Sequence, residues 1–147
     1  MKKKVYLCSP LGGNVRENLE KVKRYAAYAL KEGVVPIVPH FYALCLDDNI
    51  PAERELGISA GLSLLWYCDE IWVFGDLISA GMQREIDCCN CVNMPMRKIT
   101  GRELEQILGG NSFDQEEISD RYDLGGDSAD SDDGDLLFHD IGSLGLG

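Results

Sequence analysis

The sequence has no apolar run that approaches the roughly 20 residues needed to span a membrane. Its basic start, residues 2–4, leads into the short apolar stretch 5–8 and then reaches Gly12 and Gly13. That stretch is too short for the hydrophobic region of a signal peptide. We therefore expect a cytoplasmic protein with no membrane partner, whose first strand lies at this stretch.

Positive charge is also scarce, since 14 Lys and Arg stand against 25 Asp and Glu. The imbalance lies in one part of the chain, because residues 1–109 carry a net charge of −1 and residues 110–147 carry −10. Proteins that bind nucleic acid need clustered Lys and Arg to contact the phosphates. We therefore expect no nucleic-acid partner, whereas a small ligand with no charge or a single charge is compatible with the sequence.

The six cysteines form no CxxC pair, and three of them crowd the short segment 88–91. That spacing is a poor framework for disulfides, and free buried thiols in a reducing compartment are the simpler interpretation. A thiolate metal site is the alternative, and it would need further His or Cys ligands from elsewhere in the chain. We expect no metal and no cofactor.

The 147 residues are enough for one ordinary domain. Apolar runs typical of buried strands alternate with segments of helical periodicity. Strands are predicted at 5–8, 34–38, 70–74 and 95–99, and helices at 15–31, 51–67, 80–93 and 101–108. This alternation predicts a parallel sheet covered on both faces, in a flavodoxin-like or Rossmann-like three-layer α/β fold with four or five strands. Pro36 suggests that the second strand lies near a sheet edge or is locally broken.

The composition changes after residue 108, so we predict an α/β domain at 1–108 and an acidic tail at 109–147. Asp, Ser and Gly dominate this tail, and such a segment buries too little apolar surface to offset its ordering entropy. We expect it to be disordered when alone. A late apolar cluster at 136–144 suits either a docking motif for a protein partner or a solvated tail with chance apolar residues.

Ligands of parallel α/β sheets bind beyond the carboxyl ends of the strands. Three loops meet that condition here, at 9–14, 39–42 and 75–81. The substrate-binding residues that we predict in these loops, or directly after them, are Ser9, Pro10, Leu11, Gly12, Asn14, His40, Gly75, Ser79, Gly81 and Met82. The first loop is neither a GxGxxG fingerprint nor a Walker A loop, so it suits either a ligand or an ordinary Gly-rich turn.

The helix that begins after the third loop carries two residues of chemical interest. Ser79 suits an N-cap, and the free N–H groups of a helix N-terminus also favour an anion. Glu85 lies on an otherwise apolar face of this helix, which fits either a surface ion pair or an acid, base or nucleophile in a partly buried cleft. Tyr6 in the first strand carries a hydroxyl that needs a buried partner.

Three segments together resemble the nucleoside 2-deoxyribosyltransferase-like superfamily, in particular its small bacterial and phage branch of uncharacterised domains. They are Tyr6-Leu7-Cys8-Ser9-Pro10, the segment 68–75 (Cys-Asp-Glu-Ile-Trp-Val-Phe-Gly), and Ser79-x-Gly81-Met82-x-x-Glu85. The resemblance covers about residues 4 to 100.

This resemblance implies a flavodoxin-like fold, assembly into homodimers or larger homo-oligomers, and cleavage of the N-glycosidic bond of 2-deoxynucleosides or their 5′-phosphates. The family's nucleophilic glutamate matches Glu85, its phosphate-binding serine matches Ser79, and its first-strand tyrosine matches Tyr6. A carboxylate beneath the sugar suits an oxocarbenium-like transition state, as in retaining glycosidases.

The sequence departs from the family pattern at two positions. Gly61 stands where family enzymes usually carry an aspartate, and Gln83 stands where many have a glycine. The residues weighed as substitutes for that aspartate are Glu53, Glu55, Ser59 and Ser63. A missing acid weakens protonation of the leaving base, an effect typically worth about 10² to 10⁴ in rate. Two hypotheses follow: an N-glycosidic hydrolase or transferase, or a nucleotide-binding protein without turnover that acts as a sensor or sequesters its ligand.

Overall fold

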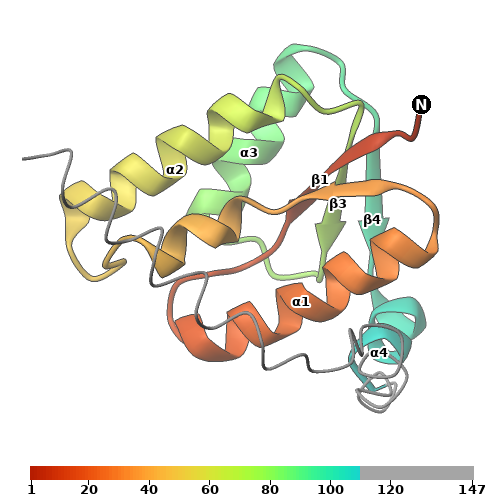
Figure 1. Cartoon of the computed structure of the whole chain (residues 1–147), viewed down its shortest axis with the longest axis horizontal. Coiled ribbons are helices and arrows are strands. Elements are labelled where there is room, and N and C mark those ends of the chain that lie inside the picture. Colours follow the sequence, from red (N-terminus) through yellow and green to blue (C-terminus); the bar gives the residue numbers. More distant parts are fainter. Residues whose placement is uncertain (110–147) are drawn as a thin grey trace, which may run out of the picture. The chain divides into compact units, whose positions relative to one another are not determined.

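A computed structural model describes residues 1–109 of the chain. The predicted acidic tail lies outside this range apart from residue 109, and so does the segment predicted to bind a protein partner. The elements are β1 Lys4–Cys8, α1 Val15–Lys31, β2 Val35–Ile37, the 3₁₀ helix η1 Pro39–Leu44, α2 Pro51–Leu65, β3 Glu70–Phe74, α3 Ala80–Cys91, β4 Met96–Ile99 and α4 Gly101–Gly109 (Figure 1). Strands and helices alternate as the sequence predicts.

The four strands form one parallel sheet in the order β2-β1-β3-β4. This confirms the predicted fold class and sets the strand number at four within the described residues. Pro36 lies in β2, which is an edge strand, where a residue without an N–H group is tolerated. The predicted position of β2 near a sheet edge is therefore confirmed.

Helices cover both faces of the sheet. Because side chains alternate along a strand, Val5 and Leu7 of β1 join α1 and α4 in one buried cluster, whereas Tyr6 and Cys8 join α2 and α3 in the other. Figure 1 shows α2 and α3 on one side of the strands and α1 with α4 on the opposite side. The three layers put Tyr6 on the same face as α3, which carries Glu85.

Local signals set the helix ends near the loops of interest. Asn14 caps α1 by accepting a hydrogen bond from the N–H of Glu17 at 3.1 Å. Ser79 caps α3 by accepting one from the N–H of Met82 at 3.2 Å. Gly33, which follows α1, has a φ of +85°, a conformation that glycine adopts without steric cost.

The segment after β2 differs from the sequence prediction. Residues 39–42 were expected as a loop, but Pro39–Leu44 form a 3₁₀ helix. Pro39 lies in its first turn, where the missing N–H group breaks no helical hydrogen bond. A six-residue helix carries too few turns for apolar periodicity to reveal it in the sequence.

Within residues 1–109, no helix combines the length and the apolar character that crossing a membrane requires.

Candidate active site

A pocket of about 200 Å³ lies at the carboxyl edge of the sheet. Its walls come from the loop after β1, the 3₁₀ helix η1, the connection before α2, α2 as far as Gly61 and the start of α3. This is the place where parallel α/β sheets bind ligands, because the loops after neighbouring strands meet there. The volume lies below the range of about 300 to 1,000 Å³ that is common for ligand sites.

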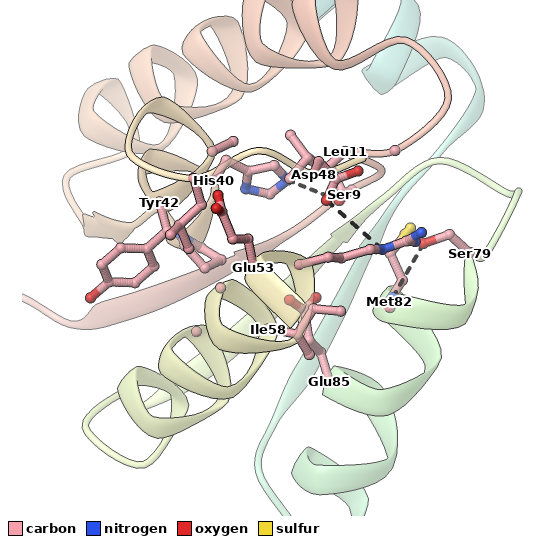
Figure 2. Close-up of a pocket in the computed structure, with 18 of the residues that line it drawn as sticks. Ser9, Leu11, His40, Tyr42, Asp48, Glu53, Ile58, Ser79, Met82 and Glu85 are labelled. Atoms are coloured by element: carbon pink, nitrogen blue, oxygen red, sulfur yellow. Dashed lines mark hydrogen bonds and ion pairs between the residues drawn. The ribbon is translucent and has the colours of Figure 1, made fainter. Parts of the chain in front are cut away.

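The structure brings most of the predicted site residues together. The predicted residues that line the pocket are Ser9, Leu11, Gly12, His40, Ser79, Gly81, Met82 and Glu85. Figure 2 shows His40 on one side, Ser79 and Met82 on the other, and Glu85 between them. Residues from three separate loops therefore face one cavity.

Three predicted substrate-binding residues are not among those that line the pocket: Pro10, Asn14 and Gly75. The side chain of Asn14 bonds the N–H and the carboxylate of Glu17, so the start of α1 occupies it. Gly75 has a φ of +95° and ends β3 with a backbone turn. Asn14 therefore caps α1, and Gly75 forms the turn that follows β3.

Glu85 forms the floor of the site, and Tyr6 holds it from behind. The Tyr6 hydroxyl donates to Glu85 Oε1 at 2.9 Å, and Tyr6 itself is fully buried behind the pocket wall. The second carboxyl oxygen, Oε2, is buried and has no hydrogen-bond partner. Burial raises the pKa of Glu85 to about 7, although interactions with the Cys8 thiol and with the Tyr6 hydroxyl oppose that shift. Burial and the neighbouring Glu85 charge raise the pKa of Tyr6, so its hydroxyl remains a donor.

Ser9 and His40 pack against each other in the wall. His40 Nε2 lies 2.9 Å from the Ser9 carbonyl oxygen and 3.1 Å from Ser9 Oγ. Both residues are buried, and burial lowers the pKa of His40, which favours the neutral imidazole. The other ring nitrogen, Nδ1, is buried without a partner.

The start of α3 supplies hydrogen-bond donors. The first N–H groups of a helix have no partner within the helix. A Cβ at Gly81 would meet Ser79 Oγ only at 3.9 Å, so the backbone here is open to a ligand. Ser79 uses its oxygen lone pair for the cap, which leaves its hydroxyl hydrogen available to the pocket.

Sequence reasoning missed several lining residues on the connection before α2 and on α2 itself. Asp48 and Arg54 both line the pocket and form an ion pair at 3.8 Å, and Tyr42 and Ile58 add apolar surface. One signal was available: Pro51 suits a first helical residue, so residues 53 and 54 fall in a first turn that faces the ligand edge.

Gly61 is a position where the structure leaves little room for a side chain. A Cβ there would lie 3.0 Å from Pro39 Cβ and 3.2 Å from the Tyr6 hydroxyl. The tyrosine that holds Glu85 therefore occupies the space that an acid at position 61 would need.

Of the four residues weighed as substitutes for the missing aspartate, Glu53 lines the pocket. Its carboxylate accepts a hydrogen bond from the N–H of Asp47. Glu55 instead forms a paired contact with Arg84 at 3.0 Å, and Ser63 donates to the Ser59 carbonyl oxygen at 3.0 Å. Among residues 1–109, no three His, Cys, Asp or Glu side chains gather in a way that could hold a metal ion.

The sheet order, the helical layers and the pocket at the carboxyl edge are those of a flavodoxin-like α/β fold. Residues 3–99 match the family described as Domain of unknown function (DUF7768), and the chain belongs to that family. A search of curated protein sequences finds no significant match.

Two solved structures share the fold. The chain is similar to a 2-deoxyribosyltransferase from the psychrotolerant bacterium Bacillus psychrosaccharolyticus, with a TM-score of 0.54 and 19% identity over 66% of this chain and 72% of that one. It is also similar to a 2-deoxyribosyltransferase from Leishmania mexicana, with a TM-score of 0.50 and 14% identity over 67% of this chain and 64% of that one. At these identities the likeness concerns the fold.

Proposed function

We propose that the chain cleaves the N-glycosidic bond of a deoxynucleoside or nucleotide, with Glu85 as the nucleophile. The observation that carries the proposal is a carboxylate at the floor of the pocket with one oxygen held by Tyr6 and the other unpartnered. Such an arrangement fixes the carboxylate through Oε1 and leaves Oε2 without a hydrogen bond that a sugar would have to displace. The fold shared with 2-deoxyribosyltransferases supports this choice of reaction class.

The reaction would proceed in two displacements, as in retaining glycosidases. Glu85 Oε2 attacks the anomeric carbon while the bond from that carbon to the base nitrogen breaks, and the base leaves with the electron pair and takes up a proton from water. The product is a glycosyl ester on Glu85. Water or a second base then attacks the same carbon and releases the carboxylate. Throughout, Tyr6 positions Oε1 by its hydrogen bond.

The raised pKa of Glu85 predicts how the rate depends on pH. The attacking form is the carboxylate, which dominates above the pKa of about 7. We expect kcat/KM for base release to rise about tenfold per pH unit below 7 and to level off above it, since only the ionised fraction reacts. A rate that is flat between pH 5 and 8 would contradict this assignment.

The reaction itself is tested by incubating the protein with 2-deoxynucleosides and their 5′-monophosphates and separating the released bases by chromatography. Glu85→Gln keeps the shape of the side chain and removes the nucleophile, so we expect base release to fall by at least about a thousandfold. Glu55→Gln, on an exposed residue outside the pocket, serves as the control and should behave as wild type. Release that Glu85→Gln leaves intact would overturn the proposal.

A second candidate is a nucleotide-binding protein without turnover, such as a sensor or a sequestering protein. Gly61 favours it, because the position offers neither an acid nor space for one beside Tyr6. Incubation with a tight ligand distinguishes the two. A ligand identified by thermal shift and recovered unchanged supports the binding protein, whereas repeated turnover excludes it.

A further inference from the structure

His40 presents a hydrogen-bond acceptor with no donor. Its Nε2 contacts the Ser9 carbonyl oxygen at 2.9 Å, and a carbonyl oxygen only accepts. Nε2 must therefore carry the proton. In the neutral ring, Nδ1 is then an unprotonated nitrogen, and it has no hydrogen-bond partner.

An unmatched nitrogen of this kind needs an explanation. His40 is only 4% exposed, and buried polar atoms in native proteins almost always have a partner. His40 also lines the pocket, so the missing donor can arrive with a ligand. Because Nδ1 is itself buried, we expect the ring or a neighbouring side chain to shift slightly when a ligand enters.

Other groups on the pocket wall have the same hydrogen-bond character. Figure 2 shows His40, Tyr42 and Glu53 on the side of the pocket away from Ser79. Glu53 lines the pocket with a carboxylate, which accepts hydrogen bonds and donates none, whereas the Asp48 carboxylate is paired with Arg54. Tyr42 and Ile58 add an aromatic ring and an apolar side chain, which suit a flat ligand. This wall therefore fits an aromatic ring that bears N–H donors.

The opposite side of the pocket has the reverse character. The start of α3 offers backbone N–H groups and the Ser79 hydroxyl, all of which donate. A nucleoside has both kinds of end, since its sugar carries oxygens and its base can carry an amino group. With the anomeric carbon above Glu85, the sugar oxygens would lie toward Ser79 and the base toward His40.

We propose that His40 Nδ1 accepts a hydrogen bond from the exocyclic amino group of the nucleobase, so that the site selects adenine and cytosine nucleosides over their hypoxanthine and uracil counterparts. An oxo group in that position would bring a carbonyl oxygen against the nitrogen lone pair and leave both without a donor. The inference rests on the proposed function and names its substrate class.

The test uses two matched substrate pairs, deoxyadenosine with deoxyinosine and deoxycytidine with deoxyuridine. We expect kcat/KM to favour the amino member of each pair by about tenfold or more, the effect of one well-formed hydrogen bond against an unpaired group. His40→Gln retains an amide that can donate to the Ser9 carbonyl but has no acceptor at the Nδ1 position. We expect it to bring both ratios close to one, whereas Glu55→Gln keeps the wild-type ratios.

Equal kcat/KM for the members of both pairs in the wild-type protein would overturn the inference, even if His40→Gln failed to fold. Ratios that His40→Gln leaves unchanged would overturn it as well. If no substrate releases its base, the proposed reaction fails, and calorimetry with free adenine and hypoxanthine then decides the inference alone. Tighter binding of adenine supports it, and equal binding, or no binding of either base, overturns it.

Discussion

At the residue scale, the contact between Tyr6 and Glu85 depends on the small size of Gly61. The Tyr6 hydroxyl needs a buried partner and finds the Glu85 carboxylate at 2.9 Å. It reaches that position because residue 61 has no side chain. The glycine that stands in place of the expected acid thus makes room for the residue that orients the Glu85 carboxylate.

Substitutions in α2 test this packing. Ala replaces Gly favourably in most helix interiors, by roughly 0.5 to 1 kcal/mol. At Gly61 the new methyl would lie 3.0 Å from Pro39 Cβ, so we expect Gly61→Ala to lower the free energy of unfolding by about 1 to 3 kcal/mol instead. Gly57→Ala is the matched control, because its methyl would meet only Leu46 Cδ1, at 3.5 Å, and should stabilise the protein.

Urea denaturation of the three proteins measures both effects. Gly61→Asp, which introduces the acid expected from the resemblance, should destabilise more than Gly61→Ala because the larger side chain also displaces the Tyr6 hydroxyl. If Gly61→Ala were as stabilising as Gly57→Ala, the close packing at this position would be refuted.

At the scale of the element, α3 depends on its cap. Ser79 Oγ accepts a hydrogen bond from the N–H of Met82. The helix that begins there places Met82 and Glu85 in the lining of the pocket. Sequence motifs predicted this cap and the start of α3 correctly. They missed η1, because Pro39–Leu44 is too short to show a period and its formation depends on packing against α2.

Replacing the cap should weaken α3 measurably. We expect Ser79→Ala to lower the free energy of unfolding by about 1 kcal/mol, since the N–H of Met82 loses its acceptor. Ser79→Asp offers an oxygen in the same position and should recover most of the loss. Thermal unfolding followed by circular dichroism distinguishes the two variants, and equal stability of Ser79→Ala and wild type would show that the cap contributes nothing.

At the scale of the whole molecule, the described residues 1–109 contain two buried apolar clusters. The two buried clusters draw their members from residues 5 to 108, on the two faces of the sheet. The predicted domain boundary at residue 108, the acidic tail and the predicted homo-oligomer remain predictions. The net charge of −10 lies on residues 110–147, outside the part of the chain that the structure describes.

A chain that ends after Gly109 should therefore fold alone. We expect the truncated protein to unfold in one cooperative transition, with a Tm within about 3 °C of the full chain, because neither core cluster loses a member. Differential scanning calorimetry on both proteins measures this. A broad transition, or a Tm that falls by 10 °C or more, would mean that residues 110–147 contribute to the fold.

The sequence by itself determined the parallel α/β fold, the edge position of β2, the caps of α1 and α3, and the motif that contains Ser79 and Glu85. Each of these depends on neighbours within a few residues or on a repeating apolar pattern. Only the tertiary structure decided that Glu53 and Arg54 line the pocket, that Tyr6 fills the space beside Gly61, and that His40 Nδ1 lacks a partner. These facts join groups that lie far apart in the chain, and only packing brings such groups together.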